Sequence, residues 1–82
     1  MTVRVTTEHI ANGLKDQHCR CPVALAMLDC KLQQPSVTPI SVSWGPYGDD
    51  RKEIYTPIKI QGFIYRFDNG DKMEPFEFEL KE

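Results

Sequence analysis

The sequence contains no long apolar segment, and this lack excludes one class of protein at once. The apolar run from Val23 to Leu28 falls far short of the roughly 20 residues that a membrane-spanning helix requires. The first residues, from Met1 to Thr6, lack the apolar stretch of a secretory signal. We therefore expect a cytoplasmic protein that does not associate with membranes.

Cysteine is scarce, and neither sign of charge dominates. A disulfide-stapled secreted domain usually has an even, dispersed set of cysteines, but here there are three, and a single residue separates Cys19 from Cys21. Ten Lys and Arg against twelve Asp and Glu give a net charge of −2, without the basic excess typical of nucleic-acid binding. The sequence thus predicts reduced thiols and argues against direct binding to nucleic acid.

The composition that remains is that of one small globular domain. The chain has 82 residues, of which 40% are hydrophobic and 27% charged, so it carries enough apolar area to fold. We expect a single domain over residues 1–82. A chain of this length buries only about 60% of its unfolded surface, so its core is small.

Strands are expected at both ends of the chain. Val3 and Val5 alternate with polar residues over 2–6. Near the other end, three apolar residues alternate strictly with charged ones; they are Phe76, Phe78 and Leu80. Residues 37–44 and 53–56 predict two further strands, separated by a turn-rich segment over 45–50. Pro39 cannot donate to a sheet ladder, so the first of these should lie at an edge or carry a bulge.

Three segments carry helix signals. The first begins at a capping threonine, Thr6 or Thr7, and ends at Gly13. The second begins at Pro22 and runs to about residue 32, with Leu25 and Leu28 predicted in the core. The third begins near residue 57 and ends at 68–70, and its apolar residues recur at helical spacing: Ile60, Phe63, Ile64 and Phe67.

The element order predicts an α+β domain. The order is β-α-α-β-β-α-β, which favours one small mixed or antiparallel sheet of three to four strands covered by two main helices.

The segment from Cys19 to Cys30 carries the most concentrated soft-ligand chemistry of the chain. Zinc accepts the side chains of His9, His18, Cys19, Cys21 and Cys30. Two cysteines one residue apart are closer than the pairs of structural zinc sites, and Cys30 lies in an apolar helix, where a free cysteine packs as a small hydrophobe. We therefore predict no cofactor and keep a zinc site as the alternative.

Thiol chemistry is a second use of the same segment. A helix N-terminus beside Cys21 would lower the pKa of its thiol, and His18 or His9 could serve as a base. The sequence shows no group to orient that histidine and no glycine-rich oxyanion loop. We therefore expect that the protein is not an enzyme.

Two sets of residues are candidates for binding another protein. Trp44 and Tyr47 lie at a turn-rich segment, and both residue types are common among binding hot spots, although they could equally cap one end of a small core. Glu77 and Glu79 share the polar face of the last predicted strand, where an acidic stripe could meet a basic partner or simply remain solvated.

One pattern spans most of the chain: Val5-Thr6, Glu8-His9-Ile10, Cys21-Pro22-Val23-Ala24-Leu25-Ala26, Phe63-Ile64, Phe67-Asp68 and Glu74-Pro75-Phe76. It resembles small proteins of phages and prophages to which no activity is attached. The resemblance implies an accessory protein of a mobile element that binds a host or phage protein, for example as an inhibitor of a host factor or defence system. The alternative is a zinc-stabilised or thiol-active protein using the Cys19–Cys30 region.

Overall fold

The computed structural model describes residues 1–80 and has strands at both ends of that range, as predicted. Its α+β composition confirms the predicted class. In chain order the elements are β1 (Thr2–Val5), α1 (Thr7–Asn12), α2 (Pro22–Asp29), β2 (Ser36–Val37), β3 (Ser41–Trp44), β4 (Lys52–Tyr55), α3 (Ile58–Asp68) and β5 (Phe76–Glu79).

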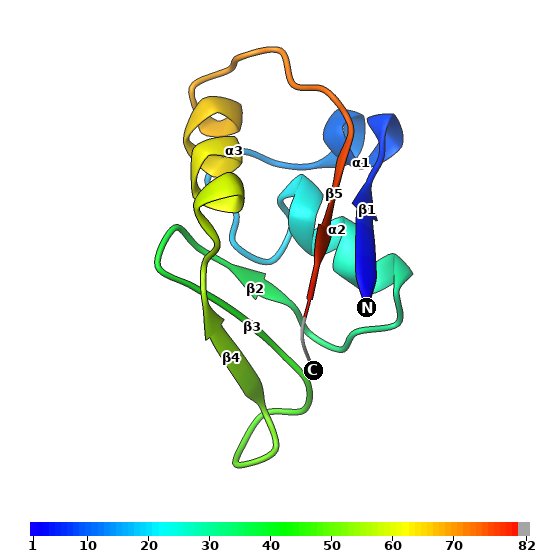
Figure 1. Ribbon diagram of the computed structural model, residues 1–82, viewed down its shortest axis with the longest axis vertical. Coiled ribbons are helices and arrows are strands. Elements are labelled where there is room, and N and C mark those ends of the chain that lie inside the picture. The colour runs from blue at the N-terminus through cyan, green and yellow to red at the C-terminus, as the bar shows by residue number, and fades with distance from the viewer. Residues whose placement is uncertain (81–82) are drawn as a thin grey trace.

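The strands divide between two antiparallel sheets, where a single sheet was expected. β1 pairs with β5, and β2, β3 and β4 form a second sheet in that order. Figure 1 shows the β1–β5 pair beside α2 and the three-stranded sheet at the other end of the molecule. The described chain contains no ladder hydrogen bonds between the two sheets, so side chains in the core hold them together.

An additional strand arises because the segment predicted as one strand over 37–44 folds back on itself. Thr38 donates its backbone N–H to the carbonyl of Ser41 at 2.9 Å, and its hydroxyl accepts the N–H groups of Ile40 and Ser41. Pro39 lies inside this turn, where a missing N–H costs nothing. The result is a hairpin of β2 and β3 that continues into β4.

Helix α2 ends earlier than predicted. Lys31 has a φ of 65°, which no helix can continue. The N–H of Leu32 bonds to the carbonyl of Met27 at 3.1 Å, and the N–H of Lys31 bonds to that of Leu28 at 2.9 Å. These two bonds form a Schellman motif, which satisfies the last carbonyls of the helix without the usual glycine.

The predicted core positions of α2 are wrong. Leu28 is 46% exposed and Leu25 is half-buried, whereas Val23 and Met27 are fully buried. Val23 and Met27 lie four residues apart and share one helix face, and the two leucines fall on the opposite side. Lack of charge along the run therefore did not reveal which face packs.

Gly13 ends α1 as predicted, but for a different reason. Its φ is −70°, which any residue can adopt, rather than the left-handed conformation of a typical glycine stop. A Cβ at this position would lie 2.5 Å from Cδ of Pro22. The glycine is therefore needed because the start of α2 packs directly on it.

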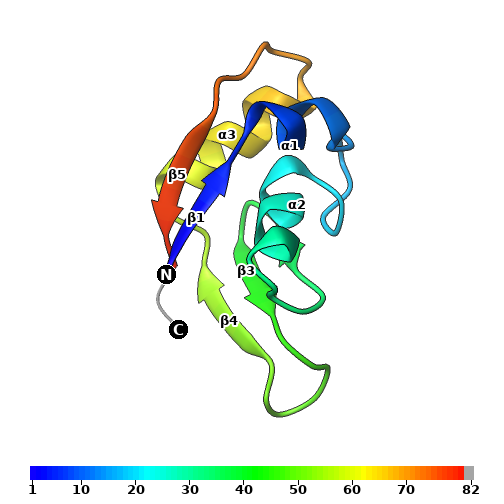
Figure 2. The same cartoon turned by 90° about the vertical axis from the view of Figure 1, so that its right-hand side faces the viewer.

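Helix α3 and strand β5 confirm their predicted patterns. The buried residues of α3 are the four predicted ones, Ile60, Phe63, Ile64 and Phe67, and Gly70 takes the left-handed conformation just past the helix, with φ of 88°. In β5, Phe78 is buried and its neighbours Glu77 and Glu79 are exposed. In Figure 2, β5 and β1 run side by side, with α2 next to β1.

Candidate functional site

The outer edge of β4 is a free sheet edge. Thr56 donates its backbone N–H to Ile40 at 3.1 Å, and Ile54 lies opposite Val42 in the β3–β4 register. In an antiparallel ladder, alternate residues turn both backbone groups toward the partner strand. The N–H and C=O groups between them, on Glu53 and on Tyr55, therefore point away from β3. No other strand of residues 1–80 pairs with this edge.

Large apolar side chains are exposed around that edge. Tyr55 is 90% exposed at the end of β4, and Ile58, at the start of α3, is 85% exposed. Ile40, in the turn beside them, is exposed as well. All three apolar side chains therefore face solvent around the end of β4.

Tyr47 lies on the exposed β3–β4 turn, as predicted, and one face of its ring contacts Arg51. Tyr47 is 74% exposed, and the guanidinium of Arg51 lies 4.8 Å from the centre of its ring. That guanidinium donates to the carbonyls of Gly45 and Gln34, each at 2.7 Å. The arginine is thus held by the backbone that flanks β2 and β3, and its contact with the ring favours one orientation of the tyrosine.

Trp44 is not displayed beside Tyr47, and of the two uses expected for this residue the structure shows the one in the core. It is the last residue of β3, and only 4% of its side chain is exposed. It packs in the core with Val42 and Val37 of the same sheet. The turn begins one residue later, so the two aromatic residues serve different purposes.

The acidic residues of β5 are paired within the protein. Glu77 lies opposite Arg4 of β1, with Oε2 3.3 Å from Nε, and Glu79 accepts a hydrogen bond from the hydroxyl of Thr2. That hydrogen bond lowers the pKa of the Glu79 carboxyl. Both carboxylates are exposed, and both link the two strands, so they already have a structural use.

The three cysteines do not meet. Cys21 and Cys30 flank the two ends of α2, so about 13 Å of helix separates them. Cys19 is exposed and Cys21 is buried. Among residues 1–80, no three His, Cys, Asp or Glu side chains gather closely enough to hold a metal ion, and His18 and His9 are no exception.

The thiol of Cys21 is also less reactive than predicted. Burial raises its pKa above the ordinary value of 9.0, and the backbone N–H groups of Val23 and Ala24 lower it by less. The helix N-terminus is therefore outweighed by desolvation, and Cys21 remains a protonated thiol at neutral pH. Cys21 lines a shallow hollow of about 300 Å³ together with His18 and Asp68.

A buried histidine, His9, joins the first two helices, a role that the sequence did not predict. Nδ1 of His9 accepts the backbone N–H of Thr6 at 2.9 Å, which leaves the proton on Nε2, 2.5 Å from Oδ2 of Asp29. Both ring nitrogens are thus satisfied, so the imidazole is not free to act as a base. The Thr6–His9 spacing of a capping box is the sequence signal for this arrangement.

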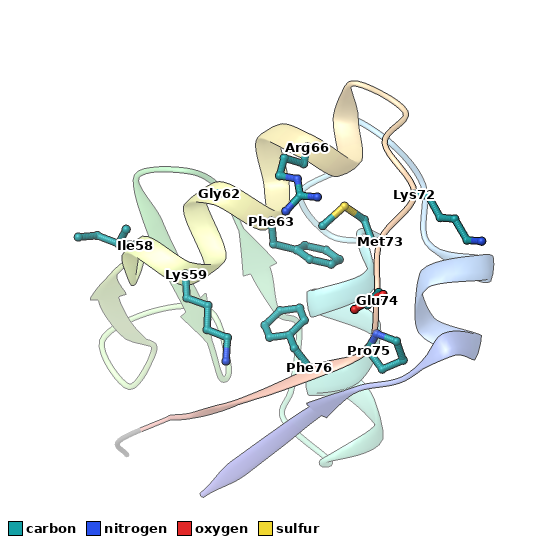
Figure 3. Close-up of a pocket in the computed structure, with 10 residues that line it drawn as sticks. All are labelled: Ile58, Lys59, Gly62, Phe63, Arg66, Lys72, Met73, Glu74, Pro75 and Phe76. Atoms are coloured by element: carbon teal, nitrogen blue, oxygen red, sulfur yellow. The ribbon is translucent and has the colours of Figure 1, made fainter.

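A cleft lies between α3 and the segment that leads into β5; we call it the α3–β5 cleft. It has a volume of about 610 Å³ and is lined by one face of α3 and by residues 72–76. Figure 3 shows Phe63 and Phe76 facing one another across it, with Met73 turned toward α3. Lys59 and Arg66 of α3 lie at its margin. Lys59, Gly62 and Arg66 are spaced three and four residues apart, which is the sequence signal for this helix face.

Comparison of the chain with protein-family models, curated proteins and solved structures finds no match. Among residues 1–80, no helix combines the length and the apolar character needed to cross a membrane.

Proposed function

We propose that this protein is a small non-enzymatic module that acts by binding another protein. The observation that carries the proposal is Tyr47, an exposed aromatic side chain whose ring contacts an arginine that is itself hydrogen-bonded to the backbone. Ordering a tyrosine at an interface normally costs conformational entropy. The contact with Arg51 favours one orientation of the ring, so less of that entropy remains to be lost on binding.

The free edge of β4 supports the same function. Its unpaired N–H and C=O groups accept an extended segment of a partner as an additional strand, and Tyr55 supplies apolar contact along the way. Tyr47 lies in the turn that leads into β4, and Tyr55 lies at the other end of that strand; we call the turn and the strand edge together the β4 surface. Natural proteins often charge such an edge, and β4 does so with Lys52 and Glu53, but its last residue is an exposed tyrosine.

The resemblance to phage and prophage proteins directs the search for the partner. It favours a cytoplasmic host or phage protein, which binding would inhibit by occupying its surface. The alternative, a zinc-stabilised or thiol-active protein, rests on the Cys19–Cys30 region and not on the β4 surface.

The test uses variants that change the β4 surface and leave the core intact. The immobilised protein is used to isolate a binding protein from a bacterial lysate, and the affinity of each variant for that purified protein is then measured. Tyr47→Ala should weaken binding at least tenfold, as truncation of an interface hot spot does. Glu53→Pro, which removes an outward N–H, should weaken binding more than Glu53→Ala.

Two matched controls make the result decisive. Tyr65 is an exposed tyrosine on α3, 60% accessible, and Tyr65→Ala should leave the affinity unchanged. Cys19→Ser removes the exposed thiol and should also be silent. If the folded Tyr47→Ala and Glu53→Pro variants bind like the parent, the proposal fails. A loss confined to Cys19→Ser would favour the thiol alternative.

A further inference from the structure

From the α3–β5 cleft we infer a second binding site, separate from the β4 surface, for an acidic peptide segment that carries an aromatic side chain. The apolar part of the cleft favours a ligand with an aromatic side chain. The rings of Phe63 and Phe76 lie with their centroids 4.8 Å apart; Phe63 is buried, and Phe76 is the partly buried ring that a ligand can reach. A volume of about 610 Å³ accommodates one or two side chains and not a folded domain.

The charge at the margin sets a second requirement. Lys59 and Arg66 border the cleft from α3, with one acid, Glu74, on the opposite segment. Lys72 also lines the cleft, but Figure 3 shows its side chain turned away from α3. The positive charge that faces the cleft is therefore that of Lys59 and Arg66, in a chain whose net charge is −2. Lys59 donates to the carbonyl of Glu77 at 3.1 Å, which orients the ammonium without neutralising it.

The charge of Arg66 is partly neutralised by an acidic neighbour, so a ligand must compete for this guanidinium. Its Nε lies 3.7 Å from Oδ2 of Asp71, and both side chains are more than half exposed. Exposed pairs of this kind are weak, so a carboxylate of a ligand can compete for the guanidinium. An acidic segment complements these cations, and its aromatic side chain would pack on the partly buried ring of Phe76.

Gly62 is the third observation. It lies in the middle of α3, where glycine is less favourable than alanine. A Cβ built there meets no atom within 4 Å, so no packing in the described chain requires a glycine. Gly62 lines the cleft, and the missing side chain keeps one face of α3 low enough for a peptide backbone to approach.

The experiment measures fluorescence anisotropy of a short labelled peptide in which aspartates and glutamates flank one central phenylalanine. We expect saturable binding that weakens as salt is raised. Replacing the phenylalanine of the peptide with glycine, or its acids with lysines, should each weaken binding at least tenfold. A labelled single-stranded oligonucleotide should bind no better than the lysine peptide.

Two pairs of protein variants locate the site. Gly62→Leu should fill the cleft and weaken binding at least tenfold, whereas Gly62→Ala should keep most of it. Lys59→Glu with Arg66→Glu should also weaken binding at least tenfold. The matched control, Lys52→Glu with Arg20→Glu, changes net charge equally at exposed positions away from the cleft and should have little effect.

The inference is overturned by any of three results with folded proteins. The first is absence of saturable peptide binding. The second is equal or tighter binding of the oligonucleotide, which would assign the cations to nucleic acid. The third is unchanged affinity in Gly62→Leu. Because Tyr47→Ala leaves the cleft intact, it should bind this peptide normally, so failure of one site does not imply failure of the other.

Discussion

Shortening Met27 to alanine should destabilise this domain far more than shortening its neighbour Leu28. The two residues are adjacent in the same apolar helix and similar in size, and sequence alone favoured Leu28 as the core residue. In the structure, Met27 is completely buried and Leu28 is 46% exposed. The pair therefore tests which face of α2 packs against β1.

The expected magnitudes differ by several-fold. Met27→Ala removes a fully enclosed side chain and leaves a cavity, which costs about 2–5 kcal/mol. Leu28→Ala loses only part of a transfer free energy of about 2 kcal/mol and leaves no cavity, so about 1 kcal/mol is expected. A domain of this length has a total stability of roughly 4–12 kcal/mol, so Met27→Ala removes a large share of it.

Thermal and urea unfolding measure both changes. One kcal/mol shifts the melting temperature of a domain this small by about 4–8 °C, so Met27→Ala should melt at least about 10 °C below the parent. Far-UV circular dichroism follows the helices, and the fluorescence of buried Trp44 follows the core. Equal losses in the two variants, or a larger loss in Leu28→Ala, would refute the packing described for α2.

Three further predictions concern other parts of the fold. Gly13→Ala should lower the free energy of unfolding by about 1–3 kcal/mol, because the new Cβ would overlap the ring of Pro22. Gly62→Ala should instead raise the melting temperature, because alanine favours a helix and its Cβ meets no neighbouring atom. Equal effects of the two substitutions in calorimetry would contradict this. Because burial raises the pKa of Cys21, the unfolded chain ionises this thiol at a lower pH than the folded protein does. The stability that Cys21 contributes should therefore be present below pH 9.0 and be lost as the pH rises further. The urea midpoint measured against pH should fall in this range, and Cys21→Ala should flatten the fall. Purified protein should contain no stoichiometric zinc, and its helicity should survive a chelator, since the described residues do not gather a set of ligands; one zinc per chain with loss of helicity in chelator would reverse this.

The segments with a regular pattern were predictable from sequence. The helical spacing of α3 and the alternation of β5 specify both the element and its buried face, because each apolar residue lies where a single period places it. Thr6 as the cap of α1 follows from local hydrogen bonding in the same way. These features depend on residues within one or two turns of each other.

What the sequence could not supply depends on contacts between distant segments. The uncharged run of α2 has no polar face to show its orientation, so the burial of Met27 in place of Leu28 is decided by β1 and α1. The left-handed conformation of Lys31 runs against its residue type. The α3–β5 cleft also needs residues 72–76 to return to α3, and only tertiary structure shows that they do.

The division into two sheets has a consequence for the order of folding. The β2–β3–β4 sheet joins near neighbours, such as Ser43 and Glu53, 10 residues apart in sequence (53 − 43), whereas β1–β5 joins Thr2 to Glu79, 77 residues apart. Closing the longer loop costs about 2 kcal/mol more in chain entropy. The amides of β1 and β5 should therefore gain protection late in refolding. Residues 72–76 lead directly into β5, so a peptide bound in the α3–β5 cleft would stabilise the pairing of β1 with β5 and slow the separation of these two strands.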